Sequence, residues 1–426
     1  MMIKRIAALA LCFLVSSAIL PSPQSEARRE IVSVPSAPTL EAKLRAMNLD
    51  LLAQWEGKIY ILAGPEDLRA LALANIRFSL ETANFPPFIR TNAAAAKRGG
   101  INGAYHTYKE LEADMLALQQ KYPGLAKVFD LGRSLEKRHL YALKVSANVF
   151  FEEDETQVLL LGCHHAREWI SVEVPFLFGK YLLEHYASDP RIKNLVDQSE
   201  VWIIPMVNPD GLEYTLHVYR YWRKNRRDNK DGSYGVDINR NYGYKWGLDN
   251  AGSSPYPASE IYRGPEAFSE PETKAIRDFF LKKNFRAMIS YHSFSQTIMY
   301  PWGYTTQAPD QEVLLKDIAA RMSALIQEVN GRIYSYGRAG QTLYLTNGDT
   351  IDWVFGTSSI PAYTIELPPV DEMSGGFFNS EADIAGIFEE NLPAMLYLVE
   401  RSTQDYQPRG TGIRLDKLID KSWLIR

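Results

Sequence analysis

The sequence predicts an α/β fold: a single domain with a mixed, mostly parallel twisted sheet and helices on both faces, preceded by a small α+β domain. Two observations lead to this prediction. Short continuous apolar runs, typical of buried parallel strands, alternate with longer helical patterns over about 300 residues. Ahead of them lies a separate set of short strand and helix patterns. The chain has 426 residues, more than one ordinary domain needs.

The N-terminus is expected to be a signal peptide covering residues 1–27. Two basic residues precede the apolar stretch Ile6–Leu20, and small residues that permit cleavage follow at Ala27, with Ala18 as another choice. A membrane anchor is the alternative, but the apolar run falls short of the ~20 residues that a spanning helix needs. We therefore expect a secreted or periplasmic protein that keeps no membrane attachment after signal cleavage.

Residues 28–90 are expected to form the small domain, in the order β-α-β-β-α-β. Its predicted elements are Glu30–Val34, a helix over Glu41–Met47, a hairpin of Leu51–Trp55 and Lys58–Leu62 around Glu56-Gly57, a helix over Pro65–Asn75, and the strand Ile76–Leu80. Residues 91–103 are interpreted as an exposed linker. Small residues, two glycines and the dibasic pair Lys97-Arg98 make it a site where proteolysis concentrates, although an uncut connector is the alternative.

The main domain is expected over residues 104–402. Its apolar strands are predicted at Val158–Leu161, Val201–Pro205, Ala287–Tyr291 and Ala362–Leu367, and its helices at Tyr108–Tyr122, Trp169–Tyr186, Glu270–Lys283, Gln311–Asn330 and Glu381–Glu400. Residues 403–426 form a tail to which the sequence assigns no role.

Composition excludes several classes of protein. A net charge of −4 gives no electrostatic footprint for nucleic acid. The apolar fraction of 46% argues against disorder. Only two cysteines are present, so no disulfide framework can form, and Cys12 lies in the predicted signal peptide. Cys163 lies beside the chemistry described next, but a buried small apolar thiol is the favoured interpretation.

Three polar residues at predicted strand ends carry the candidate chemistry. His165 and Glu168 follow the strand Val158–Leu161 and are three residues apart, so they can point at one ion. Imidazole and carboxylate are zinc ligands, and a catalytic zinc takes three protein groups. On its own this spacing also fits a helix N-terminus, where the helix dipole favours the negatively charged Glu168. His292 ends another apolar strand, and polar groups at the carboxyl ends of such strands meet above one sheet edge.

Glu366 lies at the end of a further apolar strand. A buried glutamate is costly unless it is paired or functional. A structural salt bridge is the alternative to a catalytic role.

These motifs make the sequence resemble the zinc carboxypeptidases of the A/B type, the M14 metallocarboxypeptidase family. The resemblance runs from Tyr105 to about Glu400. The motifs that carry it, in order, are His165-x-x-Glu168, Asn208-Pro209-Asp210-Gly211, Arg220-Tyr-Trp222-Arg223-Lys224, Asp237-Ile-Asn239-Arg240-Asn241, His292-Ser293, Tyr344 ahead of Ile351-Asp352-Trp353, and Glu366. The resemblance implies a zinc-dependent exopeptidase that hydrolyses the C-terminal peptide bond of peptides and proteins.

The resemblance also implies a role for each matching residue. It makes His165, Glu168 and His292 the ligands of one Zn²⁺ per chain, Glu366 the general base, and Arg223 the group that polarises the carbonyl. Asn239, Arg240 and Tyr344 correspond to the residues that grip the substrate's terminal carboxylate, and Arg167 to an accessory subsite. The small N-terminal domain would be a pro-domain that covers the cleft until the linker is cut.

The pocket for the departing side chain points to mixed specificity. Ile351 matches the base of this pocket, and a neutral aliphatic residue there favours apolar or aromatic C-terminal residues. Asp349, two residues earlier, replaces a small residue of the A-type pattern and could pair with Lys or Arg. We expect apolar C-terminal residues first and basic ones second.

Three alternatives remain at this point. A relative of the same family could cleave cell-wall peptides (peptidoglycan), which a bacterial envelope protein would fit. A non-catalytic binding module is another, although such members typically lose a ligand or the base. The basic stretch Arg220–Arg227 could instead be a solvated loop or a nucleic-acid patch, which the acidic net charge disfavours. The expected partners are peptide or protein C-termini, with no nucleic acid, and the protein is expected to be a monomer.

Overall fold

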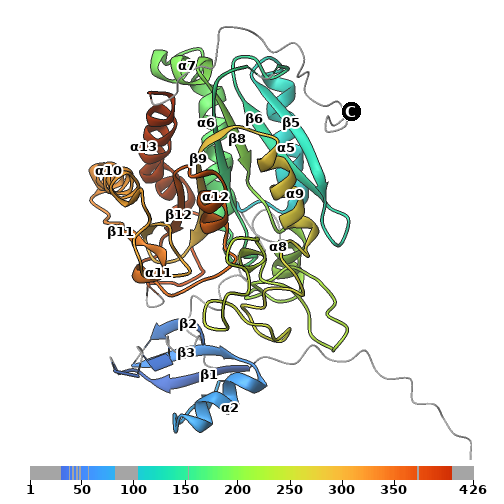
Figure 1. Cartoon of the computed structure of the whole chain (residues 1–426), viewed down its shortest axis with the longest axis vertical. Helices are drawn as coiled ribbons and strands as arrows, with labels where there is room; N and C mark the ends of the chain where they lie inside the picture. Colours follow the sequence, from blue (N-terminus) through green and yellow to red (C-terminus); the bar gives the residue numbers. More distant parts are fainter. Residues whose placement is uncertain are drawn as a thin grey trace, which may run out of the picture.

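The computed structural model describes residues 30–81, except 38, 41–42, 45–46, 48 and 56, and residues 104–404, except 152 and 372–373. The predicted signal peptide and linker lie outside the described residues, and so does the predicted tail from residue 405 onward. Two sheets organise the described chain (Figure 1).

The larger sheet has eight strands in the order β11-β10-β12-β9-β7-β8-β6-β5. Their bounds are β5 Ala126–Arg133, β6 His139–Val145, β7 Thr156–Leu161, β8 Ser199–Ile204, β9 Phe285–Ser293, β10 Thr297–Tyr300, β11 Ser335–Arg338 and β12 Ala362–Leu367. The four central strands, β12, β9, β7 and β8, are parallel to one another, and antiparallel pairs join β10 to β12 and connect β8, β6 and β5. The central four are the predicted apolar runs, so the predicted mixed sheet is confirmed.

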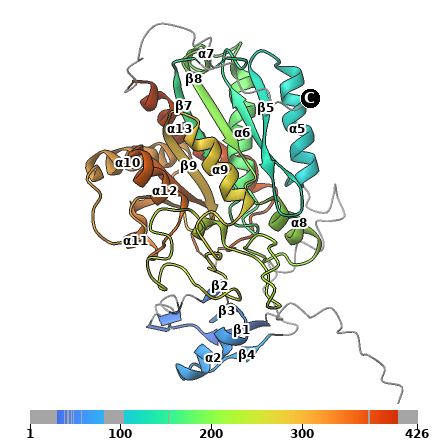
Figure 2. The same cartoon turned by 45° about the vertical axis from the view of Figure 1, so that its right-hand side comes forward.

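Helices cover both faces of this sheet (Figure 2). They are α5 Tyr108–Lys121, α6 Ile170–His185, α7 Pro190–Asp197, α8 Pro209–His217, the 3-10 turn η1 Ile238–Arg240, α9 Pro271–Leu281, α10 Glu312–Asn330, α11 Ala339–Thr342, α12 Thr350–Ser358 and α13 Asp383–Gln404. The long helices agree with the predicted ones within a few residues. Local sequence explains where α5 begins: Thr107 accepts a hydrogen bond from the backbone N–H of Glu110, whose carboxylate accepts one from the N–H of Thr107.

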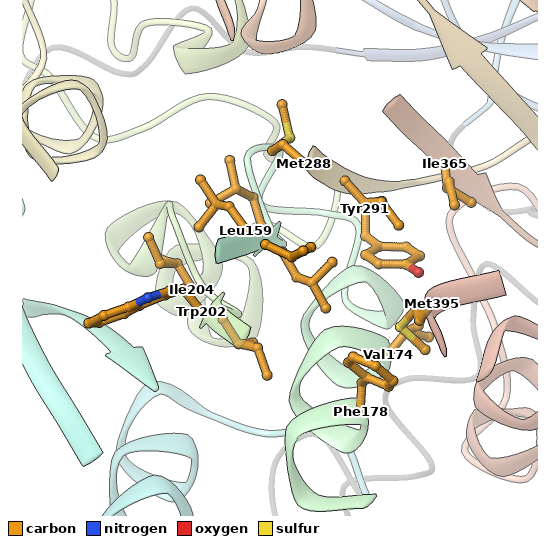
Figure 3. Packing of buried hydrophobic residues seen from close by; sticks show 14 of the residues in the cluster. Leu159, Val174, Phe178, Trp202, Ile204, Met288, Tyr291, Ile365 and Met395 are labelled. Atoms are coloured by element: carbon orange, nitrogen blue, oxygen red, sulfur yellow. The ribbon is translucent and has the colours of Figure 1, made fainter. Parts of the chain in front are cut away.

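The core of the main domain lies between the central strands and helices α6 and α13. Figure 3 shows Tyr291 of β9 close to Val174 and Phe178 of α6 and to Met395 of α13. All four side chains are buried. This packing holds the carboxyl ends of β7, β9 and β12 in a fixed arrangement, and the polar residues discussed below lie there. Among the described residues, no helix combines the length and the apolar character that crossing a bilayer requires.

The smaller sheet belongs to the N-terminal domain and has the order β2-β3-β1-β4. Its elements are β1 Glu30–Pro35, β2 Asp50–Trp55, β3 Lys58–Ala63, helix α2 Pro65–Leu73 and β4 Ser79–Leu80. Its strands pair antiparallel, and Val32, Ile61 and Leu71 are among the residues of its own small apolar core. The predicted helix Glu41–Met47 is described in part, with helical residues at 39–40 and 43–44. The domain lies against one end of the main domain, with β2 nearest to it (Figure 1).

Candidate active site

Two of the predicted metal ligands lie in the turn between β7 and α6. The N–H of Glu168 donates to the carbonyl of His165, 3.2 Å away. This turn brings the two side chains to the same side, just ahead of the helix that begins at Ile170. Gly162 allows the strand to end there, because a Cβ at this position would lie 2.1 Å from the carbonyl oxygen of Ser171. Larger side chains would therefore displace the ligand turn.

The third ligand, His292, reaches the same point from β9. Its Nδ1 lies 3.0 Å from Oε2 of Glu168 and 3.1 Å from Nδ1 of His165, whose Nδ1 is 2.8 Å from Oε1 of Glu168. One ligand atom from each residue falls within 4.8 Å of the others, and all three side chains are buried. Two imidazole nitrogens and a carboxylate converging in this way fit Zn²⁺, which binds these donors in catalytic sites.

For two of these groups, Glu168 and His292, the surroundings favour the form that binds a metal. Burial raises the pKa of Glu168, but His165 and His292 lower it more, so the carboxyl pKa lies below its usual value. Burial lowers the pKa of His292 from its usual value, which favours the neutral imidazole.

A buried carboxylate, Asp237, orients two of the candidate residues. Its Oδ1 lies 3.3 Å from Nε2 of His165, and its Oδ2 accepts hydrogen bonds from Nε and Nη2 of Arg223 at 3.1 and 2.8 Å. Burial acts to raise the pKa of Asp237, but Arg223 and Arg240 hold it well below its usual range. Sequence reasoning included Asp237 in a motif without giving it a role. No sequence signal identifies Asp237, because the fold decides which residue lies beside the second nitrogen of a ligand histidine.

Glu366 lies beside the ligands because β12 pairs in parallel with β9, with Glu366 opposite His292. It lines the same cleft as His165, Glu168 and Arg223. Burial and the nearby Glu168 raise the pKa of Glu366 well above its usual value. Among the described contacts Glu366 has no cationic hydrogen-bond partner, so the alternative of a structural salt bridge has no support.

The residues predicted to bind the substrate carboxylate lie on η1 (Asn239 and Arg240) and in the loop before α12 (Tyr344). Nη1 of Arg240 donates to the carbonyl of Asn239 at 2.7 Å, and Nε donates to the carbonyl of Gly252 at 3.1 Å. The Tyr344 ring is 43% exposed at the cleft edge, with its centre 5.9 Å from the Arg240 guanidinium carbon. Arg240 and Tyr344 line the cleft, and together with Asn239 they also line a second, smaller hollow.

Ile351 and Asp349 both line that hollow. Asp349 is the N-cap of α12, where its Oδ1 accepts from the N–H of Asp352 at 2.9 Å, and its other oxygen accepts from the hydroxyl of Thr346. Burial raises the pKa of Asp349. The structure therefore places both predicted specificity residues around one pocket.

The N-terminal domain contributes to the cleft. Asp50, at the start of β2, forms an ion pair with Nη1 of Arg167 at 2.5 Å, and both side chains are at least nine-tenths buried. Leu49, Asp50 and Leu51 line the same cleft as Glu366. The Arg167 guanidinium also stacks on Phe377, 3.9 Å from the ring centre. Both views show the N-terminal domain against this end of the molecule (Figures 1 and 2).

The basic stretch Arg220–Arg227 is largely a part of the interior. Arg223 is held by Asp237, Lys224 donates to the carbonyls of Pro257 and Ser259, and Arg220 stacks on Trp169. A solvated loop or a nucleic-acid patch needs exposed charges, so neither alternative fits these contacts. Cys163 is fully buried, and burial raises its pKa, as expected of a structural thiol.

Comparisons with known proteins agree with this geometry. The family model described as zinc carboxypeptidase (Peptidase_M14) matches residues 111–394. Carboxypeptidase B of Astacus astacus is 35% identical over 295 residues, covering 68% of this chain and 94% of that protein. A zinc carboxypeptidase of Saccharothrix mutabilis subsp. capreolus is 30% identical over 411 residues, covering 92% of this chain and 93% of that one. The crystal structure of a carboxypeptidase A from Helicoverpa armigera superposes with a TM-score of 0.74 at 25% identity, covering 88% of this chain and 97% of that one.

Proposed function

Because this chain belongs to the zinc carboxypeptidase family, whose members are zinc-dependent exopeptidases acting at C-termini, we propose a specific role for each residue of its cleft. His165, Glu168 and His292 hold the zinc. The observation that carries the proposal is the convergence of these three buried ligands within 4.8 Å beside Glu366. The bound zinc supplies a Lewis acid and lowers the pKa of a water to about 7.

The side chains around the ligands carry out the proton transfers and stabilise charge. Glu366 takes a proton from the attacking water and passes it to the leaving amine, which is the usual two-way role of a positioned carboxylate. Arg223, held by Asp237, faces the cleft and donates to the carbonyl oxygen as negative charge develops.

The requirement for a free C-terminus is assigned to Asn239, Arg240 and Tyr344. A guanidinium binds a carboxylate through two parallel hydrogen bonds, and an amide end offers no such partner. The complete set of these residues supports hydrolysis of ordinary C-terminal peptide bonds over the cell-wall alternative, which the comparisons do not favour.

This assignment is tested with peptides that share one sequence and end in Phe, Leu, Arg, Glu or an amide. We expect release of the last residue from the free acids, loss of release with a chelator, recovery on adding zinc, and no release from the amide. Cleavage of the amide at the rate of the free acid would contradict the assigned role of Arg240.

For the departing side chain, we propose a pocket with Ile351 at its base and Asp349 on its wall, which accepts apolar or aromatic residues and, second, Lys or Arg. Asp349→Asn keeps an N-cap for α12 but removes the charge. We expect kcat/KM for C-terminal Arg and Lys to fall about tenfold, because a buried charge-assisted hydrogen bond contributes about 1.5 kcal/mol or more. The rate for C-terminal Phe should stay within about twofold; an equal loss for Phe and Arg would contradict the specificity role.

The N-terminal domain, assigned to residues 28–90, is proposed to keep the enzyme inactive as a zymogen. The ion pair of Asp50 with Arg167, and the position of Leu49 and Leu51 in the cleft, support this role. We expect trypsin to cut near Lys97-Arg98 and to raise activity, and N-terminal sequencing of the active form should locate the cut between residues 91 and 103. Full activity of the uncut chain would contradict the zymogen proposal.

Secretion through the predicted signal peptide (residues 1–27), with a catalytic unit spanning residues 104–402 that works as a monomer, completes the proposal. Peptide or protein C-termini are its substrates.

A further inference from the structure

His164 precedes the ligand His165 and has no place in the assignments above. Its side chain is fully buried, and its ring stacks on the ring of His292, with centres 5.5 Å apart. Nδ1 lies 3.2 Å from the hydroxyl of Ser290, while Nε2 lies 3.1 Å from the hydroxyl of Thr350 and 2.9 Å from that of Tyr242. Every hydrogen-bond partner of the ring is a hydroxyl group, so a neutral imidazole fits this environment.

One side of His164 leads to the metal site through Ser290. The Ser290 hydroxyl lies 3.1 Å from Nε2 of His292, whose Nδ1 faces the other two ligands. For Nδ1 of His292 to offer its lone pair to a metal, Nε2 must carry the proton and donate it to Ser290. Because the Ser290 hydroxyl accepts this proton, it must donate its own hydrogen to another group. The acceptor within reach is Nδ1 of His164.

The other side leads to the substrate grip through Thr350. The Thr350 hydroxyl donates to Oδ1 of Asn239 at 2.7 Å, and the Thr350 N–H donates to the same oxygen at 3.0 Å. These two bonds fix the amide of Asn239 with its NH₂ group on the opposite side. That group lies 3.5 Å from Nε2 of His292, and because both nitrogens carry hydrogen in the tautomer required above, this contact is not a hydrogen bond. Since the hydroxyl of Thr350 gives its proton to Asn239, it accepts from Nε2–H of His164.

One tautomer of His164 satisfies both sides, with the lone pair on Nδ1 and the proton on Nε2, where the hydroxyls of Thr350 and Tyr242 both accept from the same N–H. The resulting chain of donors runs from His292 through Ser290 to His164, and then through Thr350 to Asn239. Residues from β9, the β7–α6 turn, the start of α12 and η1 are joined in this way. Such outer partners orient metal ligands and fix their tautomer.

We propose that His164 is a positioning residue that sets the tautomer of the zinc ligand His292 and the amide orientation of Asn239 at the same time. The proposal rests on the roles assigned above to His292 and Asn239. It goes beyond them because it joins metal binding to recognition of the substrate carboxylate through one buried side chain.

The test separates the contacts that lead to the zinc site from those that lead to the substrate carboxylate. Variants are made in the full-length chain, which is treated with trypsin before kinetic measurements. Ser290→Ala interrupts the zinc side, Thr350→Val interrupts the substrate side, and His164→Leu interrupts both. Zinc affinity is measured by competition with a chelator, and KM and kcat are measured at saturating zinc with a peptide ending in a free acid. The matched controls are Ser199→Ala and Thr156→Val, which remove buried hydroxyls at the other ends of β8 and β7.

We expect the two single-sided variants to affect different quantities, zinc affinity in one case and KM in the other. Ser290→Ala should weaken zinc binding about 10- to 100-fold with KM within about twofold. Thr350→Val should raise KM about five- to tenfold and leave zinc affinity unchanged, because it removes about one hydrogen bond from the support of Asn239. His164→Leu should show both losses, and the controls neither. If His164→Leu does not fold, His164→Asn is measured in its place and should show both losses, because Ser290 and Thr350 contact His292 and Asn239 directly and their variants alone do not test His164.

The proposal would be overturned if Ser290→Ala and Thr350→Val changed both readouts equally, or if a folded His164→Leu changed neither. Wild-type protein that bound no zinc would instead overturn the function proposed above, before any variant of this series was compared.

Discussion

Glu366→Gln is expected to lower kcat by a factor of about 10²–10⁴, the range that a positioned general acid–base contributes. Glutamine keeps the shape of the side chain at the end of β12 but cannot accept a proton from the attacking water. Glu366 lies opposite His292 in the sheet and lines the cleft, so it faces the space in which the substrate and the attacking water would lie. At about 1.4 kcal/mol per factor of ten, the loss corresponds to roughly 3–5 kcal/mol of transition-state stabilisation.

The measurement is steady-state kinetics on the trypsin-activated enzyme with a peptide ending in Phe, together with the zinc content of each variant. Zinc content should be unchanged, since Glu366 is not among the three ligands, and KM should change far less than kcat. The control is Glu328→Gln on α10, an exposed glutamate that pairs with Arg321. A kcat for Glu366→Gln within about threefold of wild type would assign the base to another residue.

Lys144→Met is expected to cause the largest loss of stability, about 3–5 kcal/mol in the free energy of unfolding of the main domain. Lys144 on β6 is fully buried, and its Nζ donates to Oε1 of Glu200 at 2.7 Å and to the carbonyl of Phe151 at 2.8 Å. Without the ammonium group, Glu200 would remain as a buried, uncompensated carboxylate. Burial and the neighbouring Glu153 and Glu200 already raise the pKa of Glu155 to about 8, and Lys144 opposes that rise.

The measurement is urea-induced unfolding followed by tryptophan fluorescence. Pairing Lys144→Met with Glu200→Gln removes both charges and keeps an acceptor for Trp202 and Gln157, which donate to Glu200. The double variant should therefore recover part of the loss. If Lys144→Met unfolded at the same urea concentration as wild type, the pair would contribute nothing measurable, as many exposed ion pairs do.

The sequence predicts the central sheet and the metal ligands for the same physical reason. Parallel strands buried on both faces appear as continuous apolar runs, and the first polar residue after such a run lies at the sheet edge. His292 and Glu366 follow this pattern. The short helices α8, α11 and α12 and the outer strands β10 and β11 have no comparable signal, because elements of four to nine residues are too short to establish a hydrophobic period.

The supporting residues of the site were also beyond sequence reasoning. Asp237 and His164 act on residues far away in the chain: His164 meets Thr350 across 186 positions and Ser290 across 126. Hydrophobic periodicity does not indicate contacts between residues so far apart in the sequence. The basic stretch Arg220–Arg227 illustrates the same limit, since its composition alone fits a solvated loop, while its contacts place Arg223 and Lys224 in the interior.

The central claim is that His165, Glu168 and His292 hold one zinc beside Glu366. The most direct test is the zinc content per chain of wild type, His292→Ala, Glu168→Ala and Glu366→Gln after equilibration with a zinc-buffering chelator. We expect one zinc per chain in wild type and in Glu366→Gln, and far less than one in the two ligand variants. Retention of a full zinc by folded His292→Ala and Glu168→Ala would contradict the claim and place the metal elsewhere in the chain.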